Sequence, residues 1–132
     1  MAEHLNTGAW GEDAAVEHLR GLGYAILERN WRSGQLEIDI IARHDEYLVF
    51  VEVKTRVSGE RGAPQEAVGR TKQRRLTAAA TQYLSSHDLW ESPCRFDIIA
   101  VTKTAGGLNL EHMENAFEAA ADAGGHAAWQ PW

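Results

Sequence analysis

Several features of exported, membrane-bound and zinc-binding proteins are missing from this sequence of 132 residues. Its single cysteine, Cys94, allows no internal disulfide, and neither a CxxC nor an HExxH spacing indicates zinc. No apolar run approaches the roughly 18 residues that a membrane helix needs. Residues 1–6 have neither the basic lead nor the apolar core of an export signal. We therefore expect a cytoplasmic protein that folds without disulfides and does not contact a membrane.

The motifs of nucleophilic and nucleotide-hydrolysing enzymes are also missing. The chain has no GxSxG and no GxxxxGK[ST], and Cys94 has no histidine near it in the sequence. The histidines are scattered, so each one is interpreted as a surface residue. Acyl transfer through a serine or cysteine nucleophile is therefore a poor explanation of this sequence.

The charges are unevenly distributed along the chain. The net charge is -6, which argues against indiscriminate binding to nucleic acid. Residues 54–75 nevertheless contain seven basic and two acidic side chains, so this window is +5 while the remainder is -11. Such segregation indicates either a local phosphate-binding patch or an ordinary solvated basic helix face.

Hydrophobic periodicity predicts one α/β domain over residues 1–122, followed by a flexible, Gly- and Ala-rich tail over 123–132. The strand after the second long helix can pair in parallel with the second hairpin strand through a right-handed crossover. The expected fold is a sandwich of helices around one mixed sheet. The expected helices cover residues 7–22, 64–85 and 115–122, and the expected strands cover 24–28, 35–43, 47–56, 95–102 and 108–113, the last at a sheet edge.

The strands at 35–43 and 47–56 read as a β-hairpin, since each is rich in β-branched and aromatic residues. With a loop of two or four residues, Asp39 lies opposite Glu52, and Glu37 opposite Lys54. A three-residue loop would shift this register by one, and no Asn-Gly dipeptide fixes the choice.

Two carboxylates about 5 Å apart would repel by roughly 3 kcal/mol at an effective dielectric near 20. A shared proton, a nearby cation or a divalent metal must compensate for Asp39 and Glu52. The alternative is a Glu37–Lys54 salt bridge on a solvated face. The apolar residues on both faces of these strands favour a buried and functional set of charges.

Two further charged residues fall on the apolar stripes of predicted helices. Glu12 shares a stripe with Ala15, Val16 and Leu19, as either a helix-dipole partner or a third acid aimed at the sheet. Lys72 is on the packed stripe of the basic helix, where it must snorkel or meet an acid or a phosphate. We expect four basic residues of that helix and one from the preceding strand to bind phosphates: Arg70, Lys72, Arg74, Arg75 and Arg56.

Carboxylates beside a lysine and a basic helix suit phosphodiester chemistry. Oxygen ligands favour Mg²⁺ or Mn²⁺, which commonly bind next to phosphate. Such a metal polarises the phosphodiester and lowers the pKa of a bound water, and a neighbouring lysine orients that water or stabilises developing charge.

The spacing of Asp39 from Glu52-Val53-Lys54 resembles that of the PD-(D/E)xK nuclease superfamily, and Glu12 matches the helical acid of archaeal Holliday junction resolvases. Most of the chain, about residues 7–117, is more closely similar to the bacterial YraN family, which is expected to have a nuclease-like fold. Ile38 stands where the superfamily has Pro, and Leu36 where we expect the family's Gly. The motifs that carry this similarity are Gly11-Glu12-Asp13-Ala14-Ala15, Asn30-Trp31-Arg32, Glu37 to Ala42, Leu48 to Arg56 and Arg95-Phe96-Asp97.

The resemblance implies a restriction-endonuclease-like, three-layer fold with an αβββαβ core. It implies that Asp39, Glu52 and the Val53 carbonyl bind Mg²⁺ or Mn²⁺, that Lys54 positions water, and that Glu12 acts as a further ligand through water. Glu37 has no fixed role in the superfamily and is kept as a site candidate. By analogy with resolvases the protein would act as a homodimer.

Three functions are compatible with the sequence. The first is a metal-dependent nuclease (endonuclease) that acts on DNA, including branched or damaged DNA. The second is a non-catalytic module that binds nucleic acid or a DNA-processing partner with the same fold and basic helix. The third is a structural protein in which the acids and Lys54 only neutralise each other.

Overall fold

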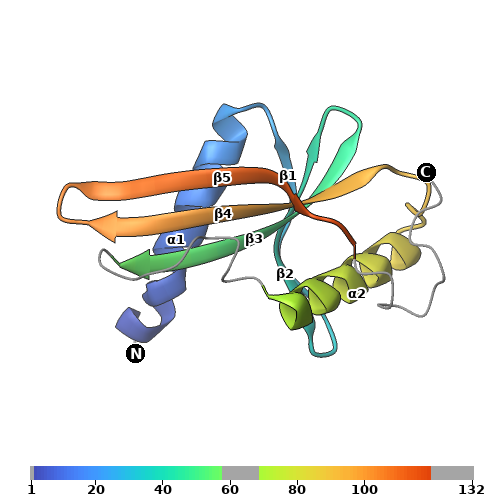
Figure 1. Ribbon diagram of the computed structural model, residues 1–132, viewed down its shortest axis with the longest axis horizontal. Helices are drawn as coiled ribbons and strands as arrows, with labels where there is room; N and C mark the ends of the chain where they lie inside the picture. The colour runs from blue at the N-terminus through green and yellow to red at the C-terminus, as the bar shows by residue number, and fades with distance from the viewer. Residues whose placement is uncertain (1, 58–68, 120–132) are drawn as a thin grey trace.

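Two helices and five strands make up the fold in a computed structural model, which describes residues 2–57 and 69–119. The elements follow the predicted order of helix, three strands, helix and two strands (Figure 1). The α/β fold expected from the sequence is therefore confirmed. The elements are α1 (Ala2–Gly21), β1 (Ala25–Ser33), β2 (Leu36–His44), β3 (Tyr47–Val57), α2 (Arg70–Ser86), β4 (Cys94–Thr104) and β5 (Gly107–Phe117).

The strands form one mixed sheet in the order β1-β2-β3-β4-β5. All neighbouring pairs are antiparallel except β3 and β4, which are parallel and are connected through α2. The β2–β3 hairpin turns at Asp45 and Glu46, and His44 pairs with Tyr47 and Ile40 with Val51. This is the predicted register for a two-residue loop.

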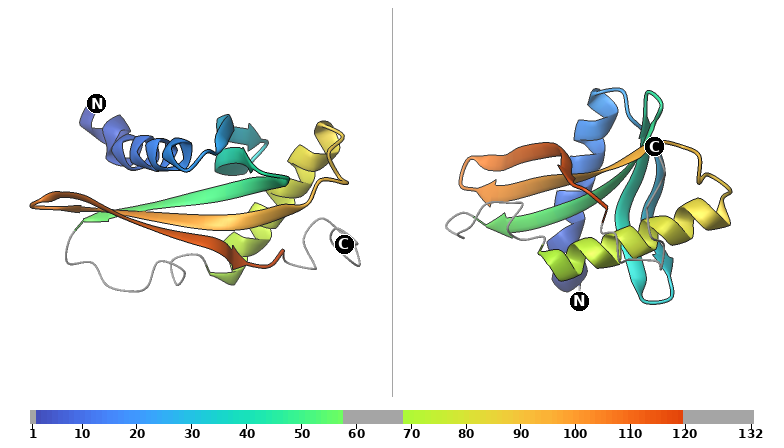
Figure 2. Two further views of the ribbon diagram at one scale, coloured as in Figure 1. Left: turned by 90° about the horizontal axis from the view of Figure 1, so that it is seen from above. Right: turned by 45° about the vertical axis from the view of Figure 1, so that its right-hand side comes forward.

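The helices cover opposite faces of the sheet, as the left view of Figure 2 shows. Two apolar clusters fill the spaces between the layers, because β3 and β4 alternate buried side chains between both faces. Phe50, Phe96 and Ile98 pack in the cluster that includes α2, whereas Val51 and Ile99 pack in the cluster that includes α1. The three-layer arrangement is thus a consequence of central strands that are apolar on both sides.

Four element boundaries differ from the sequence prediction by more than three residues. α1 begins at Ala2 and not at residue 7. β1 continues to Ser33 because its ladder with β2 extends to the Ser33–Leu36 pair. α2 begins at Arg70, since Gly69 has an extended backbone with φ -75° and ψ -177°, so no continuous helix runs from residue 64. The predicted helix start at Pro64 lies outside the described residues.

The fourth boundary is the end of β5, because the helix predicted over residues 115–122 is wrong over 115–117. These residues belong to β5, where Phe117 pairs with Phe96 and the two rings stack 4.9 Å apart. The contacts with β4 therefore outweigh local helix preference. The predicted tail, 123–132, lies outside the described residues. No helix within residues 2–57 and 69–119 is long and apolar enough to span a membrane.

Candidate functional site

Asp39 lies where β2 and β3 stop pairing. The ladder between the two strands ends at Ile40 and Val51, and beyond it the Val53 N–H donates to Oδ2 of Asp39 over 2.8 Å. The Asp39 side chain thus takes the place of a backbone acceptor where the strands separate. This hydrogen bond fixes its carboxylate next to β3.

Asp39 and Glu52 interact as the predicted register requires. Burial raises the pKa of Asp39 to about 7, together with the negative charges of Glu52 and Glu12 and a hydrogen bond to Glu52, although the Val53 N–H opposes the rise. Near neutral pH Asp39 is therefore protonated for part of the time, and in that form it can donate a hydrogen bond to Glu52. The sequence prediction that opposed acids need compensation is consistent with this shift.

A second source of compensation comes from α2. The Lys72 ammonium lies 3.0 Å from Oε2 of Glu52, whose side chain is 11% exposed, while the Lys72 side chain is 48% exposed. Burial acts to lower the pKa of Lys72, but Glu52, Asp39 and Glu37 together raise it. The expectation that Lys72 meets an acid or a phosphate is confirmed for an acid within the protein.

Glu12 faces Asp39 across a cleft of about 430 Å³. Its Oε1 accepts hydrogen bonds from Nε and Nη2 of Arg29, at 3.1 and 2.9 Å, and from Nδ2 of Asn30 at 3.0 Å. Asn30 has a positive φ of 54° within β1, between Arg29 and Trp31, which both pair with β2. The cleft is lined by Ala9, Glu12, Arg29, Asn30, Asp39, Val53 and Thr55.

A close approach of α1 to β3 brings Glu12 over the strands. A Cβ atom added to Gly11 would lie 2.0 Å from Cγ2 of Thr55, well inside van der Waals contact. Only glycine therefore allows the helix to lie at this distance from the sheet. The sequence left open whether Glu12 is a helix-dipole partner or faces the sheet, and it did not indicate that Arg29 and Asn30 hold it.

Glu37 and Lys54 are arranged differently from the Asp39–Glu52 pair. Glu37 forms an ion pair of 3.2 Å with Arg32, its partner on β1, and both side chains are exposed. Lys54 is exposed on β3, and the described residues include no ion pair between it and Glu37. Glu37 lines a second cleft, of about 260 Å³, together with Gln35, Lys72, Arg75 and Leu76.

The four predicted phosphate-binding residues of the basic helix all lie in the first two turns of α2. Arg75 donates from Nη2 to the Gln35 carbonyl over 3.0 Å, and Lys72 contacts Glu52. Both line the second cleft, so part of the basic surface borders a hollow next to Glu52. Arg56 lies on β3, and Arg61 lies outside the described residues.

The donor set can be compared with what a divalent cation requires. Within residues 2–57 and 69–119, no three His, Cys, Asp or Glu side chains form a ready-made metal cage. Asp39 borders an open cleft and interacts with Glu52, and the proton that Asp39 takes up near neutral pH is a charge that a cation could replace. This fits Mg²⁺ or Mn²⁺, because Mg²⁺ usually keeps several waters and uses one or two carboxylates.

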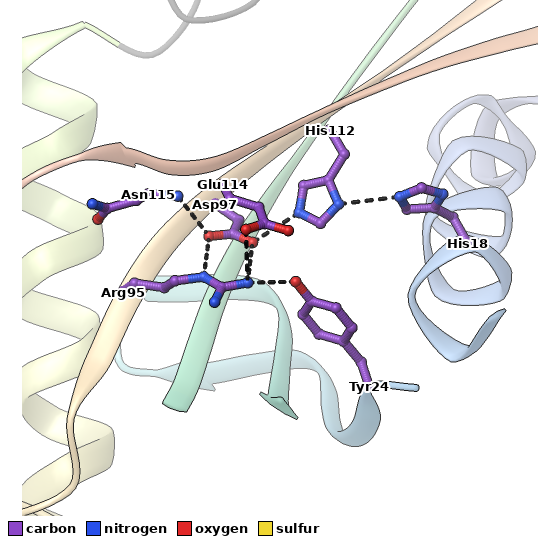
Figure 3. Close-up of polar contacts among 7 residues, drawn as sticks. All are labelled: His18, Tyr24, Arg95, Asp97, His112, Glu114 and Asn115. Carbon is purple, nitrogen blue, oxygen red and sulfur yellow. Dashed lines mark hydrogen bonds and ion pairs between the residues drawn. The ribbon is translucent and has the colours of Figure 1, made fainter. Parts of the chain in front are cut away.

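A second polar cluster, which the sequence did not reveal as such, lies between α1, β4 and β5 (Figure 3). Asp97 is fully buried and accepts hydrogen bonds from Nε of Arg95 at 3.0 Å, Nε2 of His112 at 2.8 Å and the Asn115 N–H at 3.0 Å. Burial alone would raise the pKa of Asp97, but these donors hold it below its usual value. The motif Arg95-Phe96-Asp97, with two charges on one strand face, was the available signal.

This cluster extends from Asp97 to α1 and to the start of β1. Nε2 of His18 and Nδ1 of His112 lie 3.1 Å apart, and Arg95 donates to the Tyr24 hydroxyl. Burial and the neighbouring His112 lower the pKa of His18, which favours its neutral ring. Since Asp97 has a donor on each side and is closed to solvent, the cluster is a structural connection between layers.

Comparison with known proteins gives consistent family matches over most of the chain. The model of the uncharacterised protein family UPF0102 matches residues 11–101, a span that contains Glu12, Asp39, Glu52 and Lys72. A UPF0102 protein of Nitratidesulfovibrio vulgaris is 42% identical over 127 residues, covering 96% of this chain and 95% of the relative. A UPF0102 protein of Flavobacterium psychrophilum is 49% identical over 117 residues, covering 89% and 98%.

Proposed function

The chain belongs to the uncharacterised protein family UPF0102, the YraN family, and we propose that it is a divalent-metal-dependent nuclease that hydrolyses phosphodiester bonds in nucleic acid. The family description names no activity, so the proposal depends on the site. The chain resembles PD-(D/E)xK nucleases in Asp39 and the Glu52-Val53-Lys54 motif, which lie together at the end of the β2–β3 ladder.

The observation that carries this proposal is the Asp39–Glu52 pair. Burial at the end of the ladder, together with the negative charge of Glu52, raises the pKa of Asp39 to about 7, and Asp39 also borders an open cleft. A fold gains no stability from such crowding, and perturbed acids in a cleft are typical of functional sites. A bound divalent cation would relieve the repulsion that the proton relieves in its absence.

The roles follow from where the side chains lie. Asp39, Glu52 and the Val53 carbonyl would hold Mg²⁺ or Mn²⁺, which when bound polarises a phosphodiester and acidifies a water. Glu12 faces the same cleft, with Oε1 already bonded to Arg29 and Asn30, so its other oxygen is the one suited to a metal-bound water. Lys54, two residues after Glu52 on β3, is the proposed water-positioning residue.

Nucleic acid is the proposed substrate, because basic side chains of α2 border the cleft next to Glu52. Arg70, Lys72, Arg74 and Arg75 would bind backbone phosphates, which sets the position of the duplex without reading its sequence. DNA is the proposed form, including branched or damaged DNA, and a homodimer remains a prediction from the resemblance alone.

One observation favours a second function, a non-catalytic module that binds nucleic acid. The acids of the site already have cationic neighbours, with Lys72 on Glu52 and Arg29 on Glu12. If these ion pairs persist, the same fold and basic helix would bind DNA without cleaving it.

Cleavage assays on defined substrates distinguish these functions. The purified protein would be incubated with labelled duplex, single-stranded and four-way DNA in Mg²⁺ or Mn²⁺, and with EDTA as the metal-free control. We expect metal-dependent cleavage that Asp39→Asn and Glu52→Gln abolish and that Glu111→Gln, at an exposed position on β5, leaves intact. Metal-dependent binding without cleavage would favour the module, and cleavage by Asp39→Asn at the wild-type rate would refute the site.

A further inference from the structure

Lys72 is positioned to act on both clefts. Its ammonium contacts Glu52, next to Asp39, while its side chain also lines the second cleft together with Glu37 and Arg75. It comes from the first turn of α2, on the opposite face of the sheet from α1 (Figure 2). One flexible side chain thus connects the carboxylate pair with the basic surface of α2.

The contact with Glu52 distinguishes Lys72 from the lysine that the sequence motif selects. Lys54 is nearer in sequence to Glu52, but the ammonium found 3.0 Å from Oε2 of Glu52 is that of Lys72. An ammonium and a divalent cation compete for the same oxygen, because each needs its lone pairs and negative charge. In the structure, the Lys72 ammonium holds that position.

We propose that Lys72 is the internal counter-ion of the Asp39–Glu52 pair, and that a divalent cation must displace it from Glu52 in order to bind. The displaced ammonium moves into the second cleft, next to Arg75, where it binds a phosphate of the nucleic acid. This inference rests on the proposed metal site and adds a means of regulating it. The four-carbon stem of Lys72 and its half-exposed position allow such a movement at little cost in free energy.

The exchange couples the metal to the nucleic acid. A cation on Glu52 frees Lys72 for phosphate, and a phosphate that holds Lys72 leaves Glu52 open for a cation. Linkage requires each ligand to strengthen the binding of the other by the same factor. The protein without nucleic acid would therefore bind metal weakly, and it would assemble its site on the substrate.

Calorimetry with Mn²⁺ alone, at pH 8, tests the competition on the complete chain. At this pH most Asp39 side chains have lost their proton, because the pKa of Asp39 is about 7. We expect Lys72→Met to bind Mn²⁺ about fivefold more tightly than the wild type, the upper range for a half-exposed ion pair. Lys54→Met, which removes a nearby charge that does not contact Glu52, should change the affinity less, and Asp39→Asn should abolish binding.

The outcomes separate this inference from the proposed function. If the wild type binds Mn²⁺ through Asp39 and Lys72→Met binds no more tightly, Lys72 is no competitor and only this inference fails. An equal gain in Mn²⁺ affinity in Lys54→Met would also overturn this inference, since the loss of any nearby positive charge would then have the same effect. If neither the wild type nor Lys72→Met binds Mn²⁺, or if Asp39→Asn binds as well as the wild type, the proposed metal site itself is wrong.

Chemical labelling provides a readout that does not depend on metal affinity. The rate of acetylation of Lys72 would be followed by mass spectrometry with and without Mn²⁺, with Lys103 on β4 as the internal reference. We expect Mn²⁺ to speed the labelling of Lys72 severalfold in the wild type and to have no effect in Asp39→Asn. An unchanged rate for Lys72 at a Mn²⁺ concentration that saturates the wild type would overturn the displacement.

Discussion

Replacing Asp39 with asparagine should stabilise the metal-free protein at alkaline pH. Asparagine keeps an oxygen that can accept the Val53 N–H, and its amide can donate to Glu52 as a protonated Asp39 would. It cannot carry the negative charge that Glu52 repels. The variant therefore imitates the protonated form of Asp39 at every pH.

The magnitude follows from the pKa of Asp39, which rises from 3.8 to about 7 on folding. Because the folded pKa is the higher one, folding favours the protonated form, and wild-type stability falls as pH rises from about 4 to about 7. Each pKa unit corresponds to about 1.4 kcal/mol, so the gain from Asp39→Asn has a ceiling of about 4 kcal/mol at pH 8. At pH 4.5, where most of that loss has not yet occurred, the gain should be about 1 kcal/mol.

Urea unfolding in EDTA, followed by circular dichroism at the two pH values, measures this difference. Asp45→Asn in the exposed β2–β3 turn is the matched control, and it should change the free energy of unfolding by no more than about 0.5 kcal/mol at either pH. At pH 8, Mg²⁺ should reduce the difference in the free energy of unfolding between Asp39→Asn and the wild type, because it stabilises the wild type alone. An Asp39→Asn protein that is less stable than the wild type at pH 8, or that gains equally at both pH values, would refute the electrostatic reasoning.

Three further predictions concern the structural parts of the fold. Asp97→Asn should lower the free energy of unfolding by about 3–5 kcal/mol in urea titrations, because it leaves Arg95, whose side chain is 12% exposed, without the carboxylate that it contacts at 3.0 Å. Glu114→Gln, which removes the more distant acidic partner of Arg95 at the exposed edge of this cluster, should cost less than about 1 kcal/mol. Since the folded pKa of Asp97 is depressed, its contribution should be lost as pH falls below about 4, and acid titrations in which Asp97→Asn keeps the full wild-type pH dependence would contradict this. Gly11→Ala should lower the melting temperature through its clash with Cγ2 of Thr55, at about 1–3 kcal/mol, and Thr55→Ser should restore part of the loss.

The sheet could be predicted from the sequence because its signals are local and agree with one another. β-branched runs on both sides of Asp45 and Glu46 predicted the hairpin, and its two-residue loop selects, from the registers left open, the one that places Asp39 next to Glu52. The apolar run of β3 required cover on both faces, which the two helices supply. Patterns with a period of two thus determined most of the fold and the centre of the site.

The partners of the charged residues were harder to predict, because they depend on distances between elements. Lys72 and Glu52 lie on different elements of the chain, so the motif pointed to Lys54. Likewise, only the packing of α1 against β1 shows that Arg29 holds Glu12. Helix preference failed at Asn115–Phe117 for the same reason, since β4 determines the conformation there.

The hydrogen-bond chain of Figure 3 has a consequence for how the sheet is completed. It joins His18 of the first helix to His112 of the last strand, residues that lie almost a hundred positions apart in the sequence. Before β5 pairs with β4, Asp97 lacks two of its donors, Nε2 of His112 and the Asn115 N–H. An Asp97 carboxylate that is buried before β5 is in place would lack part of its hydrogen bonding, so the addition of β5 completes the connection between α1 and β4.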